Sequence, residues 1–292
     1  MGLTIESEPL TFVTCSYRPD FERCARLCAS MNKFVSTRVV QFLIVPDRDR
    51  ALFAHLESTS RTIISIEDVL PAGFIQLPLL DKWWLDNGMW PVRGWIMQQI
   101  TKLCADVVTN CENIVFVDSD IEFIRSLQHE RFVKEGALRL YRNPIHKSDA
   151  MHLKWHLGTA ELLNLNPQYF GSDYVAPLAT WRRSNLVKMK QHIEDCQQRP
   201  WYEAFGRRTT VSEYTLYGVF VEYVLGIEKS GHFQHAENLC HSLWFADDTE
   251  KFLANFNHRS WPQAVHLQSN IGMNKADSNT LMSRLWKSGT TS

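Results

Sequence analysis

The chain has 292 residues, of which 45% are hydrophobic and 22% charged, and its formal net charge is −1. This length suits one large domain or two small ones, and the composition is that of a globular protein with a sizeable core. A near-neutral charge without runs of one sign provides no basic surface for nucleic acid. We therefore expect no nucleic-acid partner.

No stretch of the sequence reaches 18 consecutive apolar residues, so no transmembrane helix is expected. The N-terminal segment MGLTIESEPL lacks the basic region and the apolar core of a secretory signal. The seven cysteines form no CxxC pair, and most lie within apolar patterns, as in a reduced protein. We expect a cytoplasmic location and leave open a peripheral contact with the inner face of a membrane.

The first half of the chain alternates predicted strands and helices. Runs of β-branched and aromatic residues predict strands at 10–14, 39–45, 62–66 and 114–117, and helical periodicity predicts helices at 19–35, 50–57 and 95–108. The stretch 77–94 combines turn residues with aromatic side chains and is predicted to be irregular. This order of elements predicts an α/β, Rossmann-like fold with a mainly parallel central sheet flanked by helices.

The second half is less regular. Its patterns predict helices at 129–135, 146–164, 185–198 and 212–225, and strands at 137–141, 174–181 and 264–267. No internal repeat and no linker rich in Gly, Ser or Pro interrupts the chain. We therefore predict a single compact domain over residues 1–292.

Two carboxylates follow the most hydrophobic predicted strand, in the sequence VFVDSD. Asp118 and Asp120 stand at the carboxyl end of this strand, where open α/β sheets bind ligands. Side chains two residues apart in an extended segment point the same way, and two close carboxylates repel unless a cation lies between them. Mg²⁺ and Mn²⁺ bind carboxylate and phosphate oxygens, so the pair predicts a metal clamp for a diphosphate. The structural alternative is that one aspartate caps the following turn.

Several segments of the chain together resemble a known family: FVTCSYRPDFERC, IEDVLP, GWIMQQITK, VFVDSD and VSEYTLYG. A strand followed by DxD midway along an α/β chain is similar to the nucleotide-sugar-dependent glycosyltransferases of the GT-A fold. Together the segments resemble the bacterial DUF6492 family of glycosyltransferase-like proteins. The resemblance implies a GT-A-like fold with a nucleotide-sugar-binding half (about 10–125) and an acceptor-binding half (about 126–292), but it names no sugar.

The resemblance implies a metal site. In such an enzyme Mn²⁺ or Mg²⁺ bridges the diphosphate of the sugar donor and stabilises the leaving group. Asp120 is then the more direct ligand, and Asp118 reaches the ribose or the metal through water. His266, in AVHLQSN, is either a third ligand or an ordinary histidine at a strand end.

Nucleotide contacts are implied at two further places. Ser16 and Tyr17 follow the first strand, where GT-A enzymes hold the nucleoside, so Tyr17 is expected to stack on the base and Ser16 to bond to it. Asp68 ends the third predicted strand, where it accepts a hydrogen bond from the base or ribose, or else caps a turn or helix. Uridine diphosphate is the first nucleotide expected.

The helix before the metal strand carries Gln98, Gln99 and Lys102. Gln98 and Lys102 are four residues apart and share one helix face, while apolar residues face the core. This position favours contacts with the phosphates or sugar hydroxyls of the sugar donor. The alternative for Lys102 is an ordinary solvated lysine.

Glu213, in VSEYTLYG, is the candidate catalytic base. An inverting transferase needs a carboxylate to take the proton from the acceptor hydroxyl, and the spacing from Asp120 resembles that of inverting GT-A enzymes. The structural alternative is that Ser212 caps a helix and Glu213 stabilises its first turn. A retaining enzyme would not need this base, so the stereochemistry stays open.

Aromatic and basic side chains elsewhere suggest sugar or phosphate contacts. The segment Trp181-Arg182-Arg183 follows a predicted strand, and Trp83, Trp84 and Trp90 lie in the stretch 77–94, although core packing explains some of these tryptophans. The implied acceptor is a saccharide or a lipid-linked glycan, as in bacterial surface polysaccharide synthesis. The alternatives are a haloacid-dehalogenase-like phosphatase, in which DxD normally follows the first strand, and a catalytically idle nucleotide-sugar-binding protein.

Overall fold

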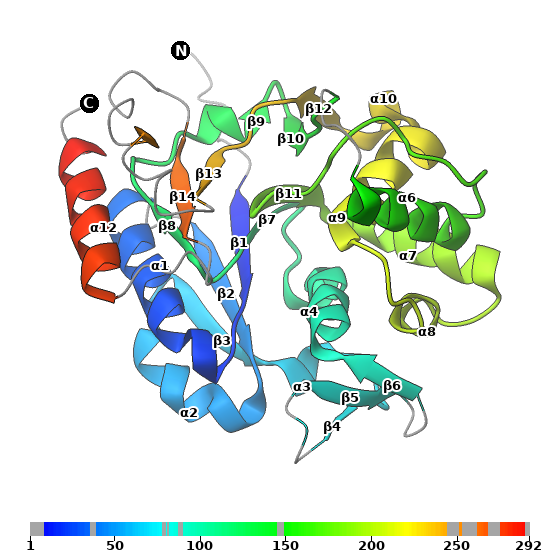
Figure 1. The fold of residues 1–292 in the computed structure, drawn as a ribbon, viewed down its shortest axis with the longest axis horizontal. Helices are drawn as coiled ribbons and strands as arrows, with labels where there is room; N and C mark the ends of the chain where they lie inside the picture. The colour runs from blue at the N-terminus through cyan, green and yellow to red at the C-terminus, as the bar shows by residue number, and fades with distance from the viewer. Residues whose placement is uncertain are drawn as a thin grey trace, which may run out of the picture.

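The central sheet of the protein is mainly parallel, as the sequence predicts. The structure is a computed structural model that describes residues 9–35, 39–77, 80, 82–86, 90–144, 149–243, 251–252, 262–267 and 275–289. The sheet has the order β11-β7-β1-β2-β3, and only β11 is antiparallel to its neighbour (Figure 1). Its strands are β1 (Leu10–Cys15), β2 (Val40–Val45), β3 (Arg61–Ser65), β7 (Asn113–Val117) and β11 (Leu178–Arg182). The predicted α/β class is confirmed.

The helices come from both halves of the chain. In the first half they are α1 (Phe21–Phe34), α2 (Arg50–Phe53), α3 (Ile66–Val69), α4 (Gly94–Leu103) and α5 (Ala105–Val108). In the second half they are α6 (Ala150–Leu162), α7 (Arg183–Gln197), α8 (Trp201–Gly206), α9 (Glu213–Val219), α10 (Ile227–Ser230) and α12 (Lys275–Gly289). A π-helix, Phe220–Gly226, continues α9. The sequence patterns predicted most of these helices but not α3, α8, α10 or α12.

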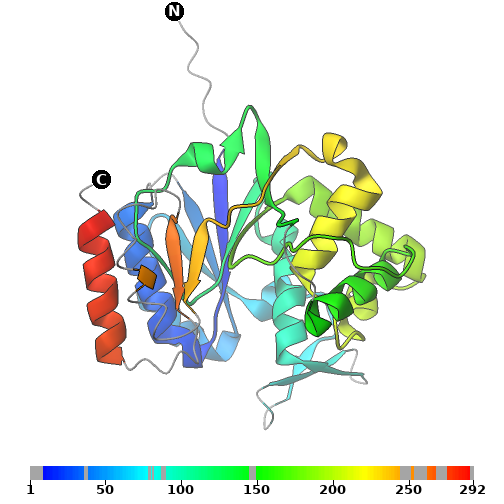
Figure 2. The same cartoon turned by 45° about the horizontal axis from the view of Figure 1, so that its top comes forward.

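Side chains alternate between the two faces of the sheet, and helices cover both. Phe12 packs with Leu27 of α1 in one cluster, whereas Phe116 packs with Ile100 of α4 in another. Both views show α1 and the C-terminal α12 on one side of the sheet, and α4, α6, α7 and α9 on the other (Figure 2). Because helices bury both faces, a ligand can reach polar side chains at the carboxyl edge of the sheet.

The described residues 83–86 and 90–93 of the stretch 77–94 are strands, so the prediction of an irregular segment is wrong there. The stretch contributes β5 (Trp83–Asp86) and β6 (Trp90–Arg93), which form an antiparallel sheet with β4 (Ile75–Gln76). Trp84 and Val92 are buried and pair across the sheet, so alternate side chains pack inward even though turn residues interrupt the pattern. The sheet lies at the start of α4, where the Gly94 N–H bonds to the Lys82 carbonyl at 2.6 Å.

Short strands form two further sheets, and all of them except β8 (Ile121–Phe123) come from the second half. β8, β13 (Cys240–Leu243) and β14 (Ala264–Leu267) have the order β13-β14-β8. β9 (Val133–Lys134), β10 (Ala137–Tyr141) and β12 (His232–His235) have the order β12-β10-β9. The predicted helix 129–135 is only a 3₁₀ turn, His129–Arg131, because β9 follows and pairs with β10.

The two predicted halves share their sheets. β11 of the second half pairs with β7 of the first half, and the late strand β14 pairs with β8. Within the described ranges, no helix is both long enough and apolar enough to span a bilayer. The assignment of one half to the sugar donor and the other to the acceptor stays a prediction.

Gly158 of α6 lies against the segment that precedes α9, and its substitution tests how closely the two pack. A Cβ at this position would overlap the carbonyl oxygen of Thr210, so we expect Gly158→Ala to lower the free energy of unfolding by about 1–3 kcal/mol. Gly206→Ala is the control, because its Cβ would meet only Ile100 and Val92 side chains at 3.5 and 3.7 Å. Equal urea-unfolding midpoints for the two variants would contradict the close approach.

Candidate active site

The motif Asp118–Ser119–Asp120 forms the turn between β7 and β8. Its backbone is fixed, because the Asp118 N–H donates to the Pro177 carbonyl at 3.1 Å and the Ile121 N–H to the Asp118 carbonyl at 3.2 Å. The Asp118 and Asp120 side chains are 28% and 22% exposed. Both carboxylates therefore lie, partly open to solvent, at the carboxyl end of β7.

His266 lies beside Asp120 because β14 runs antiparallel to β8. Its Nε2 is 3.1 Å from Oδ2 of Asp120, and its Nδ1 is 3.1 Å from Oγ of Ser242 on β13. Burial alone would lower the pKa of the imidazole, but the hydrogen bond and charge of Asp120 outweigh it and raise that pKa. The structure thus joins two predicted metal ligands that are 146 residues apart.

The Asp120–His266 contact is a hydrogen bond whose length does not by itself distinguish it from two ligands on one ion. Adjacent ligands of an octahedral ion with bonds of about 2.1 Å lie roughly 3 Å apart, and the Asp120 and His266 atoms are 3.1 Å apart. In the described part of the chain, no group of three or more His, Cys, Asp or Glu side chains is arranged to hold a metal ion. The two side chains could supply at most two ligands, so an ion bound there would have to displace the shared proton and complete its coordination with water and a substrate phosphate.

Asp118 contacts a buried lysine instead. Nζ of Lys102 lies 2.9 Å from Oδ1 of Asp118 and 3.1 Å from Oε1 of Glu213, and it donates to the Tyr214 hydroxyl at 2.6 Å. Lys102, Glu213 and Tyr214 are all buried. Lys102 is therefore not an ordinary solvated lysine, and it joins the DxD motif to the candidate base. Tyr214 completes this network and was not among the predicted site residues.

The network fixes the charge of its lysine. Burial by itself would lower the pKa of Lys102, but Asp118, Tyr214 and Glu213 outweigh burial and hold that pKa well above its usual value. Burial raises the pKa of Glu213, and the nearby Lys102 opposes the rise. Lys102 is thus a permanent positive charge between two acidic groups at neutral pH.

The first turn of α9 is held by two side chains. Ser212 is the N-cap, and its hydroxyl accepts from the Thr215 N–H at 3.4 Å, as the sequence predicts. Oε1 of Gln99 accepts from the Glu213 N–H at 2.9 Å. Gln99 therefore positions the backbone of the candidate base, and its predicted contact with the sugar donor stays a prediction.

A cavity of about 320 Å³ opens at the carboxyl ends of β1 and β2. Its lining includes Ser16, Tyr17 and Gln98, all predicted to contact the sugar donor, as well as Trp84 and Trp95. This volume is at the lower end of the range for small-molecule sites, roughly 300–1,000 Å³. α4 separates the cavity from the ion-pair network: Gln98 lines the cavity, while the buried Gln99 and Lys102 do not.

Asp68 does not end a strand, so this part of the prediction is wrong. β3 ends at Ser65 and α3 begins at once, with Asp68 exposed in its first turn. Its neighbour Glu67 closes the turn, because its carboxylate accepts from the Ser65 hydroxyl at 2.6 Å and from the Asp47 N–H at 2.9 Å. Ile66 lines the cavity and Asp68 does not, so a nucleotide contact of Asp68 stays a prediction.

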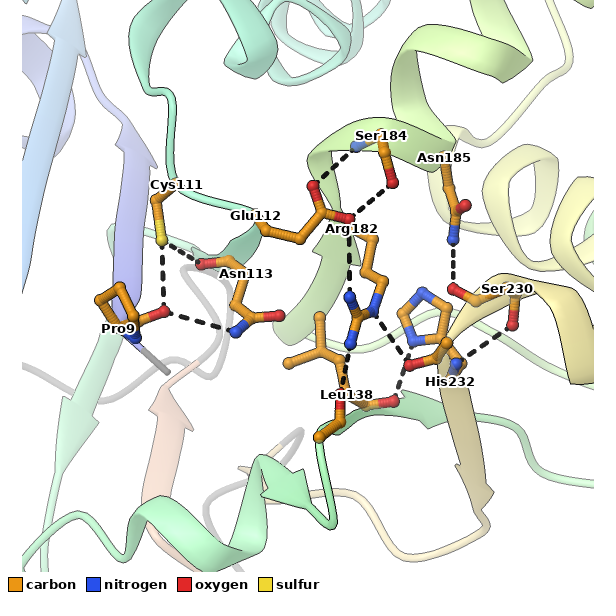
Figure 3. A network of polar contacts seen from close by, with 12 residues as sticks. Pro9, Cys111, Glu112, Asn113, Leu138, Arg182, Ser184, Asn185, Ser230 and His232 are labelled. Atoms are coloured by element: carbon orange, nitrogen blue, oxygen red, sulfur yellow. Dashed lines mark hydrogen bonds and ion pairs between the residues drawn. The ribbon is translucent and has the colours of Figure 1, made fainter. Parts of the chain in front are cut away.

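Trp181 and Arg182 lie away from the DxD edge, which corrects their suggested role. Because β11 is antiparallel to β7, Arg182 pairs with Asn113 at the opposite end of that strand. Trp181 is buried and stacks on Tyr217 at 4.7 Å. Arg182 donates to the Gly231 carbonyl at 3.0 Å and lies 3.6 Å from Glu112 within a polar network (Figure 3). These residues hold the sheet and are not free to bind a sugar.

Comparison with protein families establishes the family of the chain. The model of the family of unknown function DUF6492 matches residues 8–280. The chain belongs to the DUF6492 family. No curated protein matches this DUF6492 chain.

Solved structures give further similarities. The galactosyltransferase LgtC in complex with donor and acceptor sugar analogues is 13% identical, with a TM-score of 0.47, over 96% of this chain and 95% of that one. An active-site mutant of LgtC is 12% identical, with a TM-score of 0.47, over 94% and 95%. The apo bifunctional glycosyltransferase WbbM is 10% identical, with a TM-score of 0.48, over 98% of this chain and 50% of that one.

Proposed function

We propose that this DUF6492 protein is a metal-dependent glycosyltransferase that moves a sugar from a nucleoside diphosphate donor to a saccharide or glycoconjugate acceptor. The observation that carries the proposal is the geometry at the carboxyl end of β7. There Asp120 meets His266 and Asp118 meets Lys102, next along the sheet to a cavity at the ends of β1 and β2. Parallel α/β sheets bind nucleotides at this edge.

Asp120 and His266 are the proposed ligands of Mn²⁺ or Mg²⁺. A divalent ion bound there would neutralise the diphosphate leaving group as a Lewis acid. Asp118 is held 2.9 Å from Lys102, so its proposed role is to orient that ammonium and to bond to ribose or metal-bound water. The positive charge of Lys102 would further stabilise the negative charge that develops on the diphosphate leaving group.

The cavity is the proposed site of the nucleoside. Tyr17 is 44% exposed, so its ring is available to stack on a base. Ser16 and Gln98 offer a hydroxyl and an amide in the same lining. A uridine nucleotide is the first expectation, since uridine donors are common among the GT-A enzymes that the chain resembles.

Glu213 is the proposed base for an inverting transfer. A general base works best when its pKa approaches the working pH, and burial moves the pKa of Glu213 in that direction. Its carboxylate shares Lys102 with Asp118, which supports a place near the transfer centre. The competing role is a structural ion pair that anchors α9.

The test of the proposed function uses a panel of nucleotide diphosphate sugars with and without Mn²⁺. We expect metal-dependent release of the nucleoside diphosphate from at least one of them. The matching free diphosphate, at about 100 times its Kd and with Mn²⁺, should raise the melting temperature by roughly 5 °C, because it binds only the folded state. If no diphosphate shifts the melting curve and no sugar is released, the proposal is wrong.

A further inference from the structure

Two tryptophans from different halves of the chain meet beside the cavity. Trp95, in the first turn of α4, lines the cavity and is 47% exposed. Trp155 of α6 lies against it, with ring centroids 6.5 Å apart and planes inclined by 31°. An aromatic surface therefore extends from the cavity toward the second half of the chain.

α6 is fixed relative to the candidate base. Gly158, one turn after Trp155, leaves no room for a side chain against the Thr210 carbonyl. Thr210 precedes the Ser212 cap and Glu213 by only a few residues. The tight helix contact therefore holds Trp155 close to the segment that carries Glu213.

Trp155 is also connected to the loop behind the DxD motif. The His152 ring packs edge-on against it, with centroids 4.8 Å apart, and His152 Nε2 lies 3.7 Å from Oδ1 of Asp173. Asp173 is four residues before Pro177, whose carbonyl accepts the Asp118 N–H. Four residues span at most about 14 Å, so a short stretch of chain connects the partner of His152 to the residue that anchors the motif.

We propose that Trp155, together with Trp95, forms the surface on which a pyranose ring of the acceptor stacks. The assignment of this ring to the acceptor depends on the proposed function. Trp155 comes from the second half and is absent from the cavity lining, which separates it from the nucleoside site. A rigid aromatic face gives a sugar ring a large apolar contact at low cost in conformational entropy.

Direct binding tests this surface without any turnover. Saturation-transfer NMR with lactose, maltose and cellobiose as probes should detect ring protons of at least one of them on the wild type. Trp155→Ala should weaken that saccharide by about tenfold, and Trp155→Phe should restore part of the binding. Trp90→Ala is the control, because it removes a tryptophan that lies under Arg207 and outside the cavity lining.

Turnover then separates this inference from the proposed function. With the sugar donor that the wild type cleaves, Trp155→Ala should raise the KM for the saccharide about tenfold. The KM for the sugar donor should change less than the KM for the saccharide, because Trp155 is absent from the cavity lining. Saccharide binding without any nucleotide-sugar cleavage would support the stacking surface and refute the transferase. The stacking surface is refuted if no probe binds the wild type, or if Trp155→Ala binds saccharide as the wild type does while keeping its melting temperature.

Discussion

Asp120→Ala is expected to reduce metal-dependent turnover by roughly a thousandfold, because a Lewis-acid metal is worth several kcal/mol in the transition state. The variant loses the carboxylate that lies 3.1 Å from His266, so the affinity for the ion should fall as well. The measurement is the hydrolysis of the nucleotide sugar that the wild type cleaves fastest, over a titration of Mn²⁺. The fold should persist, since Asp120 is at the sheet edge and partly exposed.

Two comparisons make this result specific. His266→Ala should likewise raise the Mn²⁺ concentration needed for half-maximal activity, because it removes the other proposed ligand of the ion. Asp195→Ala, which removes an exposed carboxylate on α7, should leave it unchanged. Full activity of Asp120→Ala, or wild-type activity that survives EDTA, would end the metal proposal.

Glu213→Gln is expected to lower turnover by roughly a hundredfold or more, the usual contribution of a general base. Glutamine keeps the shape of the side chain but cannot take a proton, so binding of the nucleoside diphosphate should persist. Burial raises the pKa of Glu213, and the wild-type rate should therefore rise as the pH increases through this raised pKa and the carboxylate form accumulates. The pH–rate profile of the variant should lack this rise.

A purely structural ion pair predicts a different result. Loss of the charge beside Lys102 would then lower the melting temperature while leaving turnover per folded molecule and the pH profile nearly intact. Glu222→Gln is the matched control, because Glu222 follows on the same helical segment and pairs with Arg142 at 2.8 Å. It should affect stability alone. If Glu213→Gln behaves like Glu222→Gln, Glu213 is not the base.

The short aromatic strands show where sequence patterns fail. The composition of β5 and β6 is that of a loop, since both contain tryptophans and turn-forming residues. They form a sheet because they pair with each other and β5 pairs with β4. The sequence patterns also do not predict β13, which is a strand because it pairs with β14. Strands this short have too few residues for an alternation to be recognised.

In the candidate site too, local sequence patterns identify some residues and not others. Tyr214 bonds to Lys102, 112 residues earlier in the chain, and no local signal distinguishes it from other aromatic residues of an apolar helix. In the sequence, Trp181 cannot be distinguished from a tryptophan that binds sugar. The antiparallel direction of β11 places it in the core. Local patterns report which side chains are present, and the strand directions decide where those side chains lie.

By itself, the sequence determined the parallel strands β1, β2, β3 and β7 and the place of Asp118 and Asp120 after β7, because long apolar runs and their ends are local properties. It also suggested Lys102, Glu213 and His266 as candidates, through motif resemblance. Only the tertiary structure decided which of these meet: Asp120 with His266, and Asp118 with Lys102 and Glu213. The physical reason is that contacts between distant residues depend on the register and direction of the strands and helices that carry them, which no window of sequence contains.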